Sequence, residues 1–143
     1  MSLRTLFFED ISLGMSETLM RTVMETTVTQ FAEVSGDNNP IHLSADYAAN
    51  TRFGQRIAHG MFTASLISAV IGTRLPGPGA VYLSQTLRFL APVRIGDVVS
   101  AVVEVAELVE KGRRVRLACH CVVDTRRVLE GEAWVMVPSH KPS

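Results

Sequence analysis

The fold of this chain is organised around residues Ile57–Leu75, which read IAHGMFTASLISAVIGTRL. No charged residue occurs between Ile57 and Thr73, and a helix built from this stretch is small or apolar on every side. Such a helix is either buried in a core or spans a membrane. Its His, Ser and Thr residues, and a length short of the roughly 20 residues that a bilayer needs, favour a core helix. We predict that it ends at the PGPG run of residues 76–79, which cannot continue helical geometry.

Downstream of this helix, apolar residues occur at every second position. Turn formers at residues 92–97, 110–112 and 125–127 divide this region into four segments. Alternation of this kind is typical of strands that bury one face, here in an antiparallel meander. The four predicted apolar stripes are Val81, Leu83, Leu87 and Phe89; Val99, Ala101, Val103 and Val105; Val115, Leu117, Cys119, Cys121 and Val123; and Leu129, Ala133, Val135 and Val137.

The upstream residues add one strand and two short helices. Residues 16–27 are rich in Thr, Val and Met and predict a strand. Residues 28–35 predict a short helix that stops at Gly36, and Ser44 is placed to cap another that ends near Asn50. One early strand, a long helix and four strands imply an α+β domain with a curved antiparallel sheet wrapped around a single helix. One helix cannot cover such a sheet, so we expect a homodimer or higher homo-oligomer.

Composition fits one globular domain over residues 1–143, with residues 139–143 as a flexible tail. Fourteen basic and fourteen acidic residues cancel, so we expect neither nucleic acid nor a membrane as a partner. The N-terminus, MSLRTLFFED, lacks the apolar run of a secretory signal. Cys119 and Cys121 would point the same way from a strand and could not easily bridge each other. This favours reduced thiols in a cytoplasmic protein.

The loop of residues 35–42, SGDNNPIH, carries the strongest chemical signal. Gly, Asp, Asn and Pro are turn formers, so one interpretation is purely structural and leaves His42 incidental. In the functional interpretation, Asp37 and His42 direct a carboxylate and an imidazole at one point across a Pro-stiffened turn. Both groups can exchange protons with a substrate or water. Such a pair suits the addition or removal of water, and composition alone leaves both interpretations open.

A second signal is His59-Gly60, at the start of the predicted helix. The first N–H groups of a helix lack intrahelical partners and carry partial positive charge. Gly60 has no side chain to keep a ligand from its N–H. A thioester or carboxylate oxygen placed there would be stabilised as negative charge builds on it. In the structural alternative, Gly60 only permits a tight helix start and His59 packs and hydrogen-bonds there.

Motifs for other chemistries do not occur. His120 would point to the opposite face of a strand from the thiols of Cys119 and Cys121, and neither C-x-x-C nor H-x-x-x-H is present. We therefore expect no metal. No G-x-S-x-G supports a serine nucleophile, and neither Walker-type nor dinucleotide-binding glycine patterns occur. We expect no cofactor.

With these residues assembled, the chain resembles the MaoC-like (R)-specific enoyl-CoA hydratases, a family with the hot dog fold. The D-x-N-P-[IL]-H pattern, here DNNPIH at residues 37–42, is followed by HGM at residues 59–61. Each half alone is weak, but together at this spacing they are specific. The likeness begins at FAEVSG in residues 31–36 and continues through Phe53, SLIS at 65–68, LPG at 75–77 and YLSQ at 82–85 to the turn at 92–97. It implies syn addition of water to a trans-2-enoyl-CoA, with coenzyme A as part of the substrate.

The resemblance also implies roles for single residues. Asp37 and His42 match the catalytic pair that activates the water and moves a proton to or from the α-carbon. Gly60 matches the backbone donor to the thioester carbonyl. Ser68 aligns with a supporting hydroxyl, for which Ser65, one helical turn away, is an alternative. The residues expected to brace the loop and the helix start are Asn39, Pro40 and His59.

The acyl chain is expected in a dry tunnel between the helix and the sheet. Acyl chain length, coenzyme A against acyl carrier protein, and the pathway (polyester precursor supply, fatty-acid oxidation or an amino-acid-derived route) stay open. Two rival functions are an acyl-CoA thioesterase on the same fold, which would release free coenzyme, and a non-catalytic acyl-thioester-binding or dehydratase partner subunit. The arginines that could meet the coenzyme phosphates are Arg52, Arg56, Arg88 and Arg94.

Overall fold

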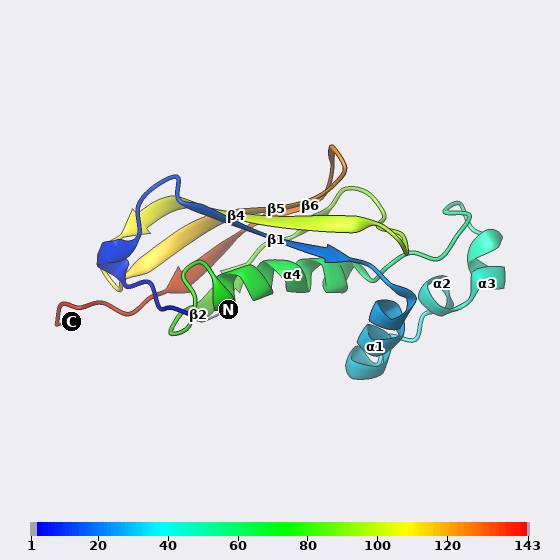
Figure 1. Ribbon diagram of the computed structural model, residues 1–143, viewed down its shortest axis with the longest axis horizontal. Helices are drawn as coiled ribbons and strands as arrows, with labels where there is room; N and C mark the ends of the chain where they lie inside the picture. Colours follow the sequence, from blue (N-terminus) through cyan, green and yellow to red (C-terminus); the bar gives the residue numbers. More distant parts are fainter. Residues whose placement is uncertain (1–2, 143) are drawn as a thin grey trace.

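The computed structural model describes residues 3–142 of the chain. A curved antiparallel sheet lies over one long helix, and three shorter helices extend beyond one end of that helix (Figure 1). This is the α+β hot dog arrangement that the resemblance implies. The elements are η1 (Phe8–Asp10), β1 (Ser16–Thr22), α1 (Glu25–Ser35), α2 (Pro40–Leu43), α3 (Ala45–Ala49), α4 (Gly60–Thr73), β2 (Val81–Gln85), β3 (Arg88–Phe89), β4 (Val98–Val109), β5 (Arg114–Val123) and β6 (Arg126–Met136).

The strands form one sheet in the order β1-β4-β5-β6-β2, and β3 also pairs with β6. Strands β4, β5 and β6 follow one another as predicted. The predicted four-strand meander is wrong in one respect, because β2 pairs with β6 while β4 pairs with β1. Turns join β4 to β5 and β5 to β6, so the outer edge of β6 is the place left for β2. The segment of residues 92–97 therefore carries the chain from that edge to the far side of the sheet.

A glycine permits the close approach between β6 and the connection from β2 to β3. A Cβ added at Gly131 would lie 1.9 Å from the backbone oxygen of Thr86. Thr86 is held in place because its N–H donates to the carbonyl of Glu132 at 2.9 Å and its Oγ1 accepts the N–H of Glu132 at 3.0 Å. A residue without a side chain is therefore required at this point.

The core lies between the sheet and one face of α4. The predicted stripes of β4, β5 and β6 are buried as expected, except that Val123 is only partly covered. Ile67 and Val70 of α4 are fully buried against them. The prediction that the helix is buried on every side is wrong, because the sheet covers only one of its faces. The exposed residues of α4 include Met61, Ser65, Ser68 and Gly72.

The stripe predicted for β2 and β3 does not face the core of this chain. Val81, Leu83 and Phe89 are 49%, 48% and 54% exposed, and only Leu87 packs partly against the core. Both strands lie at the edge of the sheet. Apolar alternation predicts a strand correctly, but it does not tell whether another element covers that strand.

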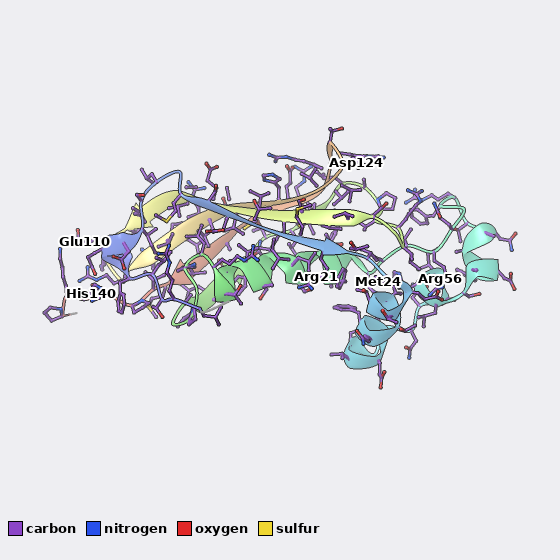
Figure 2. All side chains as sticks on the ribbon, in the orientation of Figure 1. Arg21, Met24, Arg56, Glu110, Asp124 and His140 are labelled. Carbon is purple, nitrogen blue, oxygen red and sulfur yellow. The ribbon has the colours of Figure 1, made fainter. Side chains whose placement is uncertain are left out.

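The boundary between β1 and α1 also differs from the prediction. β1 ends at Thr22 and α1 begins at Glu25, so residues 25–27 are helical rather than extended. Met24 lies at this junction (Figure 2), and its N–H donates to Oγ1 of Thr27 at 3.1 Å. Glu25 lies in the first helical turn, where the helix dipole favours an acid. These local contacts outweigh the strand preference of the threonines.

The remaining local predictions concern helix ends and the C-terminal segment. Gly36 ends α1 with φ of 81°, and Ser44 caps α3 by accepting the N–H of Tyr47 at 3.1 Å, both as predicted. Of the predicted tail, Ser139 donates to a carboxylate oxygen of Glu9 at 2.6 Å, whereas residue 143 lies outside the described residues. Among residues 3–142, no helix combines the length and the apolarity needed to cross a bilayer.

Candidate active site

The loop after α1 fixes the position of Asp37. Ser35 at the end of α1 donates its hydroxyl to the carbonyl of Phe31 at 2.7 Å and accepts the N–H of Asp37 at 3.1 Å. The carboxylate of Asp37 then accepts the N–H of Asn39 at 3.2 Å. Asp37 is exposed at the molecular surface. Its carboxylate is therefore oriented by the backbone and remains open to water and ligands.

His42 is directed inward by the single turn of α2. Asn39 caps this helix by accepting the N–H of Ile41 at 3.1 Å, and Pro40 is its first residue. The side chain of His42 is buried, and its Nδ1 lies 2.8 Å from the carbonyl oxygen of Ile57. Since a carbonyl only accepts hydrogen bonds, Nδ1 of the neutral ring carries the hydrogen. Nε2 is then left with a free lone pair, as a base requires.

His59 links this loop to the start of α4. Its Nε2 lies 3.0 Å from the carbonyl oxygen of Asp37, so by the same reasoning Nε2 carries the hydrogen. The rings of His42 and His59 stack with centroids 3.8 Å apart and planes inclined by 27°. The ring of Phe31 also packs against that of His59, with the two centroids 4.9 Å apart. The imidazole pair is therefore held between α1, α2 and α4.

The structure brings the predicted carboxylate and imidazole together. Asp37, His42 and His59 each offer an atom that could bind a metal, and these atoms lie within 4.8 Å of one another. Each imidazole, however, has one nitrogen on a main-chain carbonyl, and the two rings are stacked. This arrangement suits proton exchange between a carboxylate and a neutral imidazole. The absence of a metal stays a prediction.

Burial sets the protonation state of His42. Removal from water lowers the pKa of His42 below its ordinary value, and the nearby His59 lowers it further. The carbonyl of Ile57 and the carboxylate of Asp37 act in the opposite direction and do not overcome the burial. His42 is therefore neutral at pH 7, with its Nε2 able to accept a proton.

Gly60 is the first residue of α4, and the sequence correctly predicts that the helix starts here. Helix geometry leaves the N–H groups of Gly60 and Met61 without intrahelical acceptors. A Cβ added at Gly60 would lie 2.8 Å from the ring of Phe89. The aromatic ring thus lies against the helix start, and any side chain at position 60 would compete with it for space.

A cavity of about 270 Å³ opens beside this helix start. Its walls are mainly apolar and come from the residues before α4, from α4 itself, from the segment after β3 and from β6. Ile57 connects it to the imidazole pair, because the carbonyl of this residue binds His42. The residues that form it include Ile57, Gly60, Thr63, Phe89, Leu90 and Leu129. An acyl thioester with its carbonyl at Gly60 would have an apolar channel for its chain.

Ser65 and Ser68 are not brought to this site within the chain. Both side chains are exposed on α4, and neither lines the cavity beside Gly60. Ser65 donates its hydroxyl to the carbonyl of Phe62 at 2.5 Å. Ser68 lies eight residues beyond Gly60, which places it about 12 Å further along the helix axis. The supporting role implied by the resemblance therefore stays a prediction for both serines.

Of the four arginines considered for the coenzyme phosphates, Arg56 is engaged elsewhere. Its Nε donates to the carbonyl of His42 at 2.7 Å, and its Nη1 pairs with Glu25 at 2.8 Å (Figure 2). Arg56 therefore ties α2 to α1. Arg88 lines a separate cavity with His120 and other polar residues of the outer sheet face.

Arg52 is the arginine placed at the cavity beside Gly60. It lines this cavity, is exposed, and holds its guanidinium carbon 4.9 Å from the centre of the Phe53 ring. Arg94 instead donates to the carbonyl of Phe53 at 3.5 Å. Stacking on an aromatic ring limits the conformations of Arg52 while leaving its N–H groups available to an anion.

Sequence reasoning missed several groups that build the site. Ser35 and Phe31 lie inside the motif, but nothing in the motif says that one orients Asp37 and the other packs on His59. The carbonyl of Ile57 carries no sequence signal, because every residue has a carbonyl. Thr63 belongs to no motif, although its spacing of three from Gly60 places both residues on one face of the helix.

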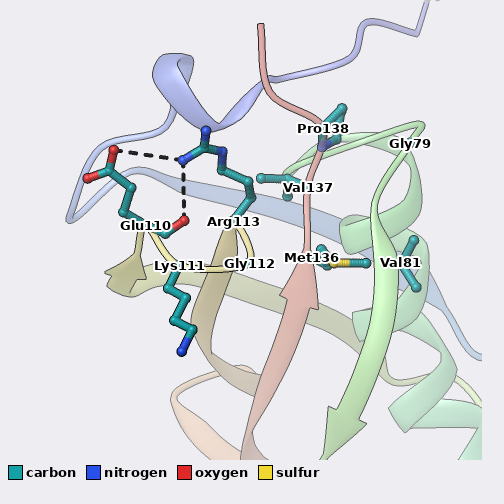
Figure 3. Close-up of a pocket in the computed structure, with 9 residues that line it drawn as sticks. All are labelled: Gly79, Val81, Glu110, Lys111, Gly112, Arg113, Met136, Val137 and Pro138. Atoms are coloured by element: carbon teal, nitrogen blue, oxygen red, sulfur yellow. Dashed lines mark hydrogen bonds and ion pairs between the residues drawn. The ribbon is translucent and has the colours of Figure 1, made fainter. Parts of the chain in front are cut away.

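A second and larger cavity lies at the other end of the molecule. Figure 3 shows it beside the start of β2 and the end of β6. Its volume is about 590 Å³. Arg113 at its rim bonds to Glu110, through the carbonyl oxygen at 3.3 Å and the carboxylate at 3.7 Å. Its lining includes Val81 of the edge strand β2 and Met136 at the end of β6, and both side chains are exposed. None of the predicted site residues lines this cavity.

Comparison with known proteins finds several that are similar over nearly the whole chain. The chain is 62% identical to a 3-hydroxybutyryl-CoA dehydratase of Methylorubrum extorquens, over 95% of this chain and 87% of the relative. It is 53% identical to an (R)-specific enoyl-CoA hydratase of Rhodospirillum rubrum, over 93% of this chain and 92% of the relative. The R-hydratase PhaJ1 of Pseudomonas aeruginosa in its unliganded form superposes with a TM-score of 0.90 at 44% identity, covering 95% of this chain and 88% of that one.

The family follows from a domain-level match as well. The model of the MaoC like domain matches residues 13–126, which include the loop of Asp37 and His42, all of α4 and most of the sheet. The chain therefore belongs to the MaoC-like dehydratase family and has its hot dog fold.

Proposed function

We propose that this protein is an (R)-specific enoyl-CoA hydratase, a hydro-lyase that adds water reversibly to trans-2-enoyl-CoA and forms (R)-3-hydroxyacyl-CoA. The observation that carries the proposal is the convergence of Asp37 and His42 beside the first residue of α4, next to an apolar cavity. The activities for which the two relatives at 62% and 53% identity are named support it.

The residues carry out two proton transfers and stabilise the negative charge that develops between them. Asp37 and His42 hold a water molecule and accept a proton from it as its oxygen bonds to C3 of the enoyl chain. The electron pair of the C2–C3 double bond shifts toward the thioester oxygen, where the N–H of Gly60 stabilises the developing charge. The pair then delivers a proton to C2. Because water and proton come from the same side chains, both add to the same face of the double bond.

The assay that tests this proposal uses crotonyl-CoA. Hydration removes the absorbance of the conjugated enoyl thioester and frees no thiol, whereas a thioesterase frees coenzyme A. The protein's own thiols should not disturb a thiol-trapping reagent, because burial raises the pKa of Cys119 to about 11 and that of Cys121 to about 12. Loss of absorbance together with thiol release would favour the thioesterase, and ligand binding without turnover would favour a non-catalytic subunit.

The pH dependence of hydration should follow His42. Its lowered pKa keeps the ring neutral at pH 7, so kcat/KM should be level there and fall only on the acid side of about 6.5. The unfolded chain takes up this proton at a higher pH than the folded one, so the melting temperature should also fall in the acid range. Rates and melting curves from about pH 5 to about pH 8 test this. A rate that already declines from about pH 7.5 to about pH 6.5 would contradict it.

Arg52 is proposed to bind the phosphates of coenzyme A at the cavity mouth. In an Arg52→Gln variant, KM for crotonyl-CoA should rise about tenfold, because a charge-assisted contact is lost. KM for crotonyl-N-acetylcysteamine, a thioester without phosphates, should not change. Arg114→Gln is the matched control, because Arg114 is exposed at the start of β5, beside the second cavity, and also stacks on an aromatic ring, that of Trp134. Equal changes with both thioesters would show that Arg52 supports the structure instead.

We also propose that a second copy of the chain covers the apolar sheet edge, as the predicted homodimer requires. The exposed residues of that edge, in β2 and β3, include Val81, Leu83 and Phe89. Light scattering should give at least twice the chain mass of 15.6 kDa, and Leu83→Arg should lower the measured mass toward one chain. A wild-type protein that stays monomeric at micromolar concentration would contradict this. A cytoplasmic location remains a prediction, supported by the two free cysteines.

A further inference from the structure

Thr63 lacks the side-chain hydrogen bond that two other helical threonines make. Thr29 donates its hydroxyl to the carbonyl of Glu25 at 3.3 Å, and Thr73 donates to that of Ala69 at 2.6 Å, which is the usual pattern four residues back. Thr63 is only 2% exposed, and within residues 3–142 its Oγ1 has no hydrogen-bond partner. An unpaired buried hydroxyl costs about 1–3 kcal/mol. The fold thus accepts the cost of an unpaired hydroxyl at Thr63, whereas Thr29 and Thr73 avoid that cost through their hydrogen bonds.

The unpaired hydroxyl of Thr63 lies at the candidate active site. Thr63 lines the cavity beside Gly60, whose other walls are mainly apolar. Side chains on a helix lean toward its N-terminus, so Thr63 lies over the turn that begins with Gly60. A helical threonine populates two χ1 rotamers, so its hydroxyl can point in either of two directions. Because the hydroxyl has no partner to lose, turning between them breaks no hydrogen bond.

We propose that Thr63 is a second hydrogen-bond donor to the thioester oxygen, beside the N–H of Gly60. This assignment rests on the proposed hydratase function. When the substrate binds, the hydroxyl of Thr63 turns toward the oxygen and donates to it. The bond strengthens as the oxygen gains negative charge, so it stabilises the transition state more than the bound substrate.

One competing partner lies within the chain. Nδ1 of His59 is also buried and unpartnered among the described residues, and it belongs to the residue four positions before Thr63. Residues at this spacing are neighbours on a helix surface. If the hydroxyl served mainly to bond His59, removing it would weaken the folded protein. If it serves the substrate, removing it would relieve an unpaired group in the free protein.

The experiment compares Thr63→Val, which keeps the shape and removes the hydroxyl, with Thr63→Ser, which keeps the hydroxyl. With crotonyl-CoA, Thr63→Val should lower kcat/KM about 100-fold, mostly through kcat, while Thr63→Ser should stay within about threefold of wild type. Without ligand, the melting temperature of Thr63→Val should equal or exceed that of the wild type, since an unpaired hydroxyl is gone. The distinctive result is a Thr63→Val variant that is much less active than the wild type but melts at the same or a higher temperature.

Three other results would overturn the assignment. Unchanged kcat/KM in Thr63→Val means that the hydroxyl does not contact the substrate. A lowered melting temperature with a matching loss of activity means that the hydroxyl bonds within the chain, with His59 as the partner. A wild-type protein that does not hydrate crotonyl-CoA or longer enoyl-CoAs removes the proposed function itself, and with it the oxygen that Thr63 would bind.

Discussion

Replacing Asp37 with asparagine should lower hydration of crotonyl-CoA about 1000-fold while leaving the fold intact. The amide has nearly the same shape and can still accept the N–H of Asn39, so the loop should keep its conformation. It cannot take a proton from water, however. The expected loss lies in kcat, with KM little changed, because the substrate contacts at Gly60 and the cavity remain. Steady-state kinetics and a melting curve on the same preparation measure both effects.

His42→Ala should give a loss of similar size, because the pair acts on one water molecule and neither member suffices alone. Asp46→Asn is the matched control, since Asp46 is an exposed carboxylate in the neighbouring helix α3. It should retain wild-type kinetics. If either Asp37→Asn or His42→Ala keeps more than about a tenth of the wild-type rate, the assignment of the pair is wrong.

Gly131→Ala should destabilise the fold by about 3 kcal/mol or more. The added methyl group would lie 1.9 Å from the backbone oxygen of Thr86, which a rotamer change cannot relieve because the obstacle is main chain. Either the pairing of β6 with β2 and β3 opens, or the variant fails to fold. Chemical denaturation followed by circular dichroism measures the change.

The control for this variant is another glycine-to-alanine change. Gly72 lies in the last turn of α4, and a Cβ there would meet no atom within 4 Å. Alanine should stabilise this position by about 0.5–1 kcal/mol, because glycine disfavours helix. Equal stability of the two variants would show that the approach of Thr86 to β6 is looser than the structure indicates.

Much of the fold could be predicted because its core is strongly periodic. The buried alternation of β4, β5 and β6 and the apolar run of α4 are signals that tertiary contacts reinforce. The loop of Asp37 and His42 could be located because its turn formers and its two titratable residues fall within eight positions. The resemblance then supplied what spacing alone left open, namely that the pair meets the start of α4.

The errors share a physical origin in contacts that sequence does not encode locally. Val81 and Leu83 alternate as core residues do, yet they lie on an edge strand. Thr27 favours strand by propensity, yet its hydroxyl accepts a backbone N–H at the start of a helix. In each case a neighbour in space, or its absence, decides the outcome.

The main-chain carbonyls that bind both imidazoles have a consequence for how this site withstands sequence change. His42 depends on the carbonyl of Ile57, and His59 on that of Asp37. A point mutation can replace a side chain, but it leaves a carbonyl in place wherever the backbone path is kept. Substitutions at the surrounding positions therefore do not change which nitrogen of each ring carries the hydrogen. Substrate preference can then diverge through the cavity walls while the proton chemistry stays fixed.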